Sequence, residues 1–321
     1  MRFAFTDDQL AFRDAVRDLL ANECPPAVVR EAWDNADGRS GALWGALAEM
    51  GVLGAAAPED QGGLGFSLLD LVLITEETGY AALPEPFVEH AVVAVPTLPD
   101  ATAAASGAVL VTAALGGAAF APAAAAADLL LAEEDDTLVL AARDALVVRP
   151  EPGVDGSRRL GWVEWDRAEP VGDAGALAAA FDRGALGTAA QLVGLARRML
   201  DLTVDYVGAR EQFGVPIGSF QAVKHHLADA RIAVEFARPL VYRAAWSCTH
   251  GDPEAPLHVS MAKATASDAA TLTARKALQS HGAMGYSFEY DLHLFMKRAW
   301  ALAASWGDAA WHRARVGRAI L

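Results

Sequence analysis

Cysteine is scarce in this sequence of 321 residues. Only Cys24 and Cys248 are present, and neither belongs to a Cys-x-x-Cys or Cys/His cluster. A disulfide framework and a structural zinc site both need closely placed thiols, so neither is expected, and we predict no metal site. Two isolated thiols are typical of a protein in a reducing compartment such as the cytoplasm.

Positive charge and long apolar runs are also in short supply. The 26 Lys and Arg residues face 41 Asp and Glu residues, for a formal net charge of -15. An acidic surface repels phosphate backbones, which argues against a nucleic-acid partner. No uncharged run has the ~18 residues of a membrane span, and the first residues lack a basic stretch followed by an apolar core. We therefore expect no membrane span and no export signal.

The apolar content of 53% is ample for a packed core. Residues 1–98 have helical periodicity: Thr6 and Gln9 form a capping box, and a glycine-rich loop from Pro58 leads into a helix from about Ser67. We predict an N-terminal helical domain over 1–98.

The pattern changes over 99–176, where short apolar runs such as TLVLAA and ALVVRP alternate with Asp, Gly and Pro. Short apolar runs separated by such residues are typical of strands, and Asp135-Asp136 is a plausible hairpin turn. A small β domain is expected there. From 177 to 321 the helical period returns, with four helices over about 186–207, 221–244, 256–281 and 290 to the end, which favours a four-helix bundle. The fold class is mainly α with a small β domain.

The segment REQFGVPIGSFQAVKHHLADA, residues 210–230, is the most informative part of the chain. It predicts a turn between two helices that carries Arg210 before it and Lys224, His225 and His226 after it. The guanidinium of Arg210 could pair with a diphosphate through two charge-assisted hydrogen bonds, or it could simply cap helix carbonyls. The residues alone leave both readings open.

The segment resembles the signature of the acyl-CoA dehydrogenases, and so does Pro58-Glu-x-x-Gly-Gly-x-Gly with its following helix. The resemblance implies FAD-dependent α,β-desaturation of an acyl-CoA, with electrons passed to an electron-transfer flavoprotein. It also implies that Arg210, Gln212 and Phe213 contact the FAD of a neighbouring subunit. The family motif Gln-x-x-Gly-Gly-x-Gly matches Gln279 and Gly282 on the FAD diphosphate side, with Ala283 in place of the second glycine.

Gln221 and His225 lie in the matching part of the signature, although a helix cap and a core or interface histidine are equally good readings. The glycines at 282 and 285 could also be an ordinary helix C-cap. The resemblance is strong over 58–80 and 186–321 and weak over 100–176, where the expected flavin-ring motifs are missing. We therefore expect an incomplete flavin-ring pocket.

The family reaction needs a carboxylate that removes a proton, a contribution of roughly 10²–10⁴-fold. One family position for this Glu corresponds to Trp306 and the other to Gly184. Asp308 and Asp182 lie near these positions, but solvated or capping carboxylates are the simpler interpretation. The catalytic residue is therefore unassigned, with Asp308 as a weak candidate.

These departures suggest the non-catalytic sister subunit of a heteromeric enzyme of the actinobacterial type. Such a chain would complete the FAD site of a catalytic partner acting on a fatty or steroid-derived acyl-CoA. Two alternatives stay open: a self-sufficient homo-oligomeric dehydrogenase using Asp308 as base, and a flavin-free scaffold protein.

Overall fold

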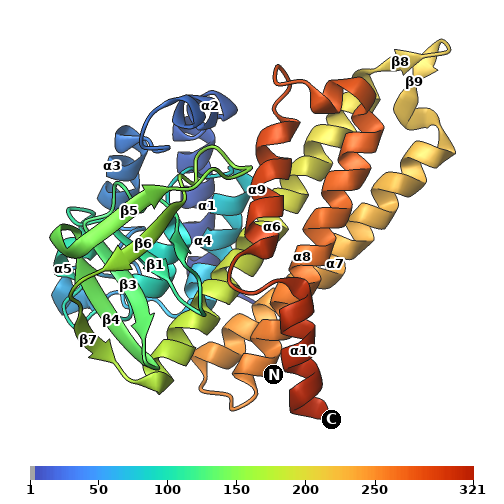
Figure 1. Cartoon of the computed structure of the whole chain (residues 1–321). Coiled ribbons are helices and arrows are strands. Elements are labelled where there is room, and N and C mark those ends of the chain that lie inside the picture. The colour runs from blue at the N-terminus through green and yellow to red at the C-terminus, as the bar shows by residue number, and fades with distance from the viewer. Residues whose placement is uncertain (1–3) are drawn as a thin grey trace.

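The chain begins with a group of helices in the computed structural model, which describes residues 4–321 (Figure 1). Both helix starts that the sequence indicates are confirmed: Thr6 and Gln9 form a capping box on the first helix, and Ser67 with Asp70 forms another. The elements of this region are α1 (Asp7–Glu23), α2 (Pro26–Asp34), α3 (Gly41–Glu49), η1 (Glu59–Gln61), α4 (Leu68–Tyr80), the π-helix η2 (Val88–Ala94) and α5 (Thr102–Ala105).

Two small sheets follow, and one apolar layer fills the space between them. The first has the order β1-β3-β4-β7, with β1 and β3 parallel, and the second has the order β2-β6-β5. The hairpin at Asp135-Asp136 is confirmed, with both residues at positive φ. The strands are β1 (Val111–Ala114), β2 (Phe120–Ala121), β3 (Leu129–Glu134), β4 (Thr137–Ala142), β5 (Leu146–Pro150), β6 (Gly161–Trp165) and β7 (Glu169–Gly172), with a 3-10 turn, η3 (Arg143–Ala145), before β5.

The last part of the chain is a bundle of long helices, which runs beside the sheets in Figure 1. The helical period predicted over 186–207 and 221–244 is confirmed, and each of α6 and α7 buries one apolar side. The elements are α6 (Ala174–Ala209), β8 (Glu211–Gln212), β9 (Val215–Pro216), η4 (Ile217–Ser219), α7 (Gln221–Thr249), α8 (Ala255–His281), η5 (Gly282–Tyr286), α9 (Leu292–Ala304) and α10 (Ala309–Ile320). A mainly α fold with a small β part is therefore confirmed, while the domain limits at 98 and 176 stay a prediction.

The prediction of one last helix from residue 290 to the end is wrong. The helix stops at Ala304, and α10 starts afresh at Ala309 with Asp308 as its N-cap. Trp306 has φ +55° and Gly307 has φ +79°, a left-handed backbone that cannot continue a right-handed helix. The break turns the chain back over α8, on which α10 packs.

The N-terminal helices are joined to the bundle where α4 crosses α6. A Cβ on Gly194 would lie 2.6 Å from the backbone nitrogen of Tyr80, and a Cβ on Gly79 would lie 2.5 Å from Cα of Gln191. Only glycine permits so close an approach. Beside this crossing, Arg197 pairs with the buried carboxylate of Glu76 at 2.5 Å. The crossing therefore holds the N-terminal helices against α6 of the bundle.

Candidate functional site

The segment 210–216 forms a hairpin that projects from one end of the bundle (Figure 1). Arg210 is the C-cap residue of α6, and β8 pairs with β9 through a two-residue turn at Phe213 and Gly214. Both turn residues have positive φ, as tight hairpins require, although a Phe adopts this conformation at a cost. The Phe213 side chain is 94% exposed. The hairpin thus presents an aromatic ring and Arg210 to the outside.

The second predicted motif lies at the same end of the bundle. Gln279 is exposed near the end of α8, and Gly282 follows at φ +60° and ψ -136°, a conformation available only to glycine. The Tyr206 ring, one turn before Arg210, stacks on His281 with centroids 4.2 Å apart. The Tyr206 hydroxyl donates a hydrogen bond to the His281 carbonyl at 3.4 Å. The two motifs are therefore held together, as the sequence suggests.

His281 is a residue that the sequence analysis missed. Its side chain is 3% exposed, and within residues 4–321 its Nε2 atom has no hydrogen-bond partner. Burial lowers the pKa of this histidine, so the ring is neutral near pH 7. An unpaired buried polar atom next to Gly282 fits a site completed by another molecule. The only sequence feature that points to His281 is its position between Gln279 and Gly282.

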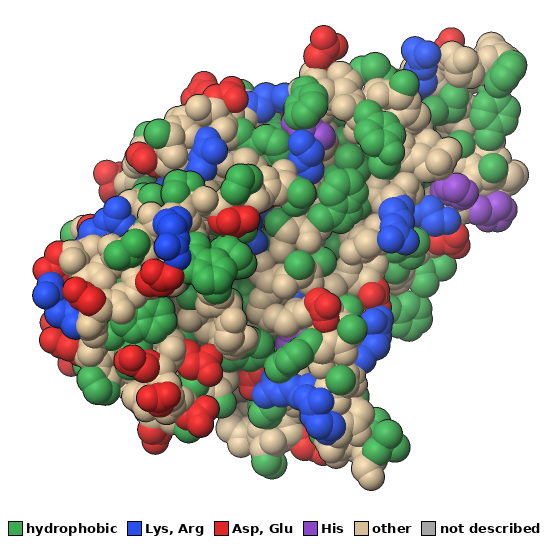
Figure 2. All heavy atoms as spheres, viewed as in Figure 1, with side chains coloured by type: hydrophobic (Ala, Val, Ile, Leu, Met, Phe, Trp, Pro, Cys, Tyr) green, Lys and Arg blue, Asp and Glu red, His purple; other side chains and the backbone are tan. Residues whose placement is uncertain are grey.

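Cations gather at this end of a chain that is acidic overall. Arg210, Lys224 and His225 are exposed, and Figure 2 shows histidines and basic side chains on the flank of the bundle below the hairpin. An anion such as a diphosphate suits this charge and the open backbone at Gly282. The bundle end therefore suits an anionic ligand. Gln221 is also exposed, at the start of α7.

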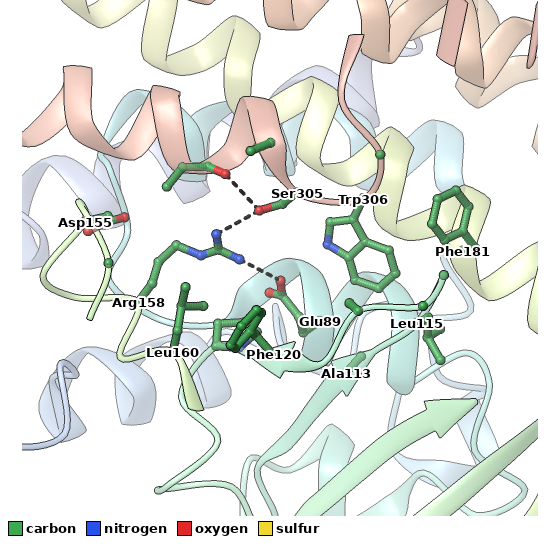
Figure 3. A pocket seen from close by; sticks show the side chains of 18 of the residues that line it. Glu89, Ala113, Leu115, Phe120, Asp155, Arg158, Leu160, Phe181, Ser305 and Trp306 are labelled. Atoms are coloured by element: carbon green, nitrogen blue, oxygen red, sulfur yellow. Dashed lines mark hydrogen bonds and ion pairs between the residues drawn. The ribbon is translucent and has the colours of Figure 1, made fainter. Parts of the chain in front are cut away.

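A cavity of about 470 Å³ lies between the β region, η2 and the segment that joins α9 to α10 (Figure 3). Its walls are mostly apolar, and two buried charged pairs reach it. Its walls include Glu89, Phe120, Arg158, Phe181, Ser305 and Trp306.

Trp306 and Gly184, the two positions at which the resemblance places the family base, lie against each other. The Trp306 indole packs against Gly184 so closely that a Cβ on Gly184 would overlap the ring, 2.5 Å from Cδ2. The Trp306 ring is also 6.0 Å from the ring of Phe181, between centroids. Positions 184 and 306 are therefore in contact, and the space between them is filled by the Trp306 indole.

The sequence analysis also missed the polar groups of the cavity. Arg158 donates a hydrogen bond from Nη1 to Ser305 Oγ at 2.8 Å, and its Nη2 lies 3.8 Å from the Glu89 carboxylate. Figure 3 shows Arg158 between these two residues. Close by, Asp155 is buried and paired with Arg298. Glu89 and Arg158 lie 69 positions apart in the chain, so no local pattern could have joined them.

The two aspartates of the sequence analysis have structural partners. Asp308 is exposed and accepts a hydrogen bond from the Trp311 amide at 2.7 Å, as an N-cap does. Asp182 is neither solvated nor capping, since it is buried and accepts two hydrogen bonds from Arg315. Burial raises the pKa of Asp182 although Arg315 opposes this. Asp308 faces a shallow groove between α8 and α10 instead of the cavity.

Two buried groups hold the segment that carries Trp306. Lys263, fully buried on α8, donates to the carbonyls of Ala303 at 3.2 Å and Gly307 at 2.9 Å. Burial lowers the pKa of Lys263 to about 7. His312 places Nε2 2.8 Å from the Trp306 carbonyl. The break between α9 and α10 is therefore held by hydrogen bonds from α8 and from α10 itself.

Comparison with known proteins decides the family. Residues 6–117 match the acyl-CoA dehydrogenase N-terminal domain, and residues 174–321 match the C-terminal domain. The chain is 32% identical over 303 residues to the acyl-CoA dehydrogenase IpdE2 of Mycobacterium tuberculosis, an alignment that covers 91% of each protein. This chain belongs to the acyl-CoA dehydrogenase family. The family consists of oxidoreductases that act on acyl-CoA, and its members use FAD.

Further relatives agree with this assignment. The IpdE2 protein of Mycolicibacterium smegmatis is 34% identical over 304 residues, covering 92% of this chain and 93% of the relative. A chain of the ChsE4–ChsE5 complex from Mycobacterium tuberculosis superposes with a TM-score of 0.91 at 26% identity, covering 99% of this chain and 98% of that chain. The Tcur3481–Tcur3483 steroid ACAD shares the fold, with a TM-score of 0.89 at 24% identity and 98% coverage of both chains.

Residues 4–321 contain no candidate metal cluster and no candidate membrane span. Among residues 4–321 no group of three or more His, Cys, Asp and Glu side chains is arranged to hold a metal ion. In the same part of the chain, every helix is too short or too polar to cross a bilayer.

Proposed function

We propose that this chain is the non-catalytic subunit of a heteromeric acyl-CoA dehydrogenase. In this proposal Arg210, Gln212, Phe213, Gln279 and Gly282 complete the FAD site of a partner chain that supplies the base. Bound FAD would supply the redox chemistry, as acceptor of the β hydride, while the α proton would pass to the base of the partner chain. The residues of this chain bind and orient the nucleotide part of the cofactor.

One observation carries the proposal: the Trp306 indole lies on Gly184, where a catalytic family member would have its Glu. An indole has no basic atom and cannot remove a proton from the α carbon. The segment is fixed from behind by Lys263, which favours a settled structural role for Trp306.

The exposed aromatic side chains at the bundle end support the need for a partner. Phe213 is 94% exposed, Tyr286 74% and Phe288 66%. Apolar groups gathered on a surface are typical of protein or ligand contacts. They lie beside the motifs of Arg210 and Gly282, so a chain that covers them would also meet the cofactor residues. The similarity to a chain of the ChsE4–ChsE5 complex is in keeping with a heteromer.

A self-sufficient dehydrogenase is the second candidate function. Asp308 is a poor candidate for its catalytic base, because the carboxylate caps α10 outside the cavity. Glu89 is a better candidate for the base, because its carboxylate lies at the cavity beside Arg158. This candidate requires the chain to bind FAD and to desaturate a thioester alone.

Expression of the chain alone and together with a neighbouring acyl-CoA dehydrogenase gene separates these functions. The measurements are the flavin absorbance of the purified protein and ferrocenium-linked turnover of acyl-CoA thioesters, with fatty and bulky steroid-derived acyl groups. Flavin and turnover only in the pair support the proposal. Turnover by the chain alone supports the second candidate, and absence of flavin from both preparations supports a flavin-free scaffold. Electron-transfer flavoprotein can then be tested as the natural acceptor.

A further inference from the structure

A second, smaller cavity lies where α1, α2 and α4 meet α6 and α9. Its volume is about 190 Å³, and it shares no lining residue with the larger cavity or with the motifs at the bundle end. Most of its wall is apolar. Its polar lining residues are Arg17, Glu77, Tyr80 and Arg198.

Arg198, which is half-buried on α6, makes little use of its hydrogen-bonding capacity. A guanidinium has five N–H donors. Within residues 4–321 Arg198 forms no salt bridge, and its one hydrogen bond is a long one, from Nη1 to the Tyr80 hydroxyl at 3.5 Å. That hydroxyl donates in turn to Asp201 at 2.9 Å, so the Asp201 carboxylate reaches Arg198 only through Tyr80. Most donors of Arg198 are therefore left for another molecule.

The neighbouring arginines are paired. Arg17 lies 2.9 Å from the Glu77 carboxylate, and Arg197 lies 2.5 Å from that of Glu76. Both glutamates are buried in these pairs, so the cavity keeps the one positive charge of Arg198 in a protein whose net charge is -15. Water can hydrate this cation but cannot neutralise it. A charge removed from bulk solvent is stabilised by an opposite charge, which favours an anion as the occupant.

Two aromatic rings hold the Arg198 guanidinium. Its central carbon lies 5.3 Å from the ring centroid of Tyr80 and 5.7 Å from that of Phe295. A guanidinium that packs on rings keeps the N–H groups in its own plane for hydrogen bonds. A planar carboxylate matches this fork with two parallel, charge-assisted bonds.

The cavity also limits the size and charge of the ligand. A volume of about 190 Å³ is below the roughly 300–1,000 Å³ of sites for drug-sized molecules, so the ligand has few heavy atoms. Burial raises the pKa of Glu77, but the bonds from Arg17 and Arg197 outweigh this effect and lower it. Glu77 is therefore ionised near pH 7, and it disfavours a second negative charge on the ligand.

The apolar wall, which includes Leu20 and Phe295, suits a short hydrocarbon chain. We propose that this cavity binds a short-chain monocarboxylate whose carboxylate pairs with Arg198. The site goes beyond the proposed function of the bundle end and does not depend on it.

Fluorine NMR of 4,4,4-trifluorobutyrate with the full chain tests this proposal. Binding broadens the fluorine resonance of the probe, and a titration gives its dissociation constant. The neutral comparison probes are 4,4,4-trifluorobutanol and 4,4,4-trifluorobutyramide. We expect the carboxylate to bind in the millimolar range and about 10-fold or more tightly than either neutral probe, because these cannot form a charge-assisted pair with Arg198. Butyrate should displace the probe, whereas phosphate and chloride at the same concentration and ionic strength should displace far less.

Variants locate the binding. Arg198→Gln should weaken binding of the carboxylate about 10-fold or more and leave the neutral probes unchanged, and Arg198→Lys should recover part of the loss by charge alone. Ala21→Trp, at an exposed position of the cavity wall, should block all three probes. Arg318→Gln changes an exposed arginine outside the cavity and should leave binding unchanged. Circular dichroism shows whether each variant is folded.

Four results would overturn the proposal. They are equal affinity for the carboxylate and the neutral probes, displacement by chloride or phosphate as efficient as by butyrate, unchanged affinity in folded Arg198→Gln or Ala21→Trp, and no broadening at millimolar probe. The readout does not depend on flavin or turnover. A failure here therefore leaves the proposed heteromeric function standing, and a colourless assembly leaves this site standing.

Discussion

At the end of the bundle, Arg210, Gln212 and Gly282 are exposed on a hairpin and a helix terminus, whereas in the cavity Trp306, Arg158 and Glu89 are packed or paired. The family motifs are retained at the first place, where another chain can reach them. At the second place, Trp306 and Gly184 occupy the positions at which the resemblance places the family base. This contrast is the physical reason for assigning the chain a role toward a partner's cofactor.

The largest expected effect is on stability and comes from the buried ion pair of Arg298 beside the cavity. Arg298 pairs with Asp155 and also donates to the Leu83 carbonyl and Ser157 Oγ, so it joins α9 to the β region. Arg298→Met leaves Asp155 buried without a countercharge and should lower the free energy of unfolding by about 3–5 kcal/mol. Arg149→Met, in an exposed pair with Glu164, is the control and should cost less than about 1 kcal/mol. Denaturant melts measure both, and equal losses would contradict the role given to the Arg298 pair.

Arg210 tests the exposed side. Arg210→Ala in the co-purified assembly should weaken FAD binding by about 10- to 100-fold, because charge-assisted hydrogen bonds to a diphosphate are lost. Titration of the apo assembly with FAD, followed by flavin fluorescence, gives the dissociation constant. Arg210→Lys should recover part of the loss by charge alone. Unchanged affinity in Arg210→Ala would remove the hairpin from the cofactor site.

The ionisation of buried Lys263 should make the stability of the protein depend on pH. Its pKa is lowered to about 7 in the folded chain, so the unfolded chain binds more protons above pH 7, and stability should rise with pH from about 7. The window is about pH 7 to 9, because buried Cys24 and Cys248, with raised pKa values, reverse the trend once unfolded thiols ionise. The slope from Lys263 is at most about 1.4 kcal/mol per pH unit.

Chemical denaturation at several pH values measures this slope. Lys263→Met should flatten it, whereas Lys276→Met, which changes a lysine in a surface pair with Asp229, should not. A slope that is the same in the wild type and in Lys263→Met would show that Lys263 does not titrate in this window.

Gly184→Ala probes the packing under Trp306. The added methyl group meets the indole ring and should cost about 1–3 kcal/mol, as overpacked cores do. In the double variant Gly184→Ala with Trp306→Ala the clash is removed, so the double-mutant cycle should give a coupling of about 1 kcal/mol or more. Additive losses would mean that the two positions do not meet.

The smallest effect concerns Asp308. Asp308→Ala removes the N-cap of α10 and should cost about 1 kcal/mol of stability. Turnover by the assembly should stay within about twofold, whereas a catalytic base would cost about 100-fold or more. Asp308→Asn retains the cap and serves as the control.

Local sequence patterns were sufficient where local physics decides the structure. The cap at Thr6, the helix start near Ser67 and the helical periodicity of α6 were predicted because capping and periodicity depend on neighbouring residues. The break at Trp306 was missed because helical periodicity continues across it. The break is held by two hydrogen bonds from Lys263, about forty residues away, to the Ala303 and Gly307 carbonyls.

The same holds for the sites. The bundle end was proposed from motifs in the chain, since its residues belong to two short segments. Glu89 and Arg158 come from η2 and from the loop between β5 and β6, and only the packed structure brings them to one cavity. Their pairing has no sequence signature.

The flavin content of the purified assembly tests the central claim most directly. The ratio of flavin, from absorbance near 450 nm, to total chains should be one FAD for each pair of this chain and its partner. In Trp306→Phe this ratio should not change. One FAD per chain, or a stable FAD complex of this chain alone that turns over an acyl-CoA, would contradict the claim.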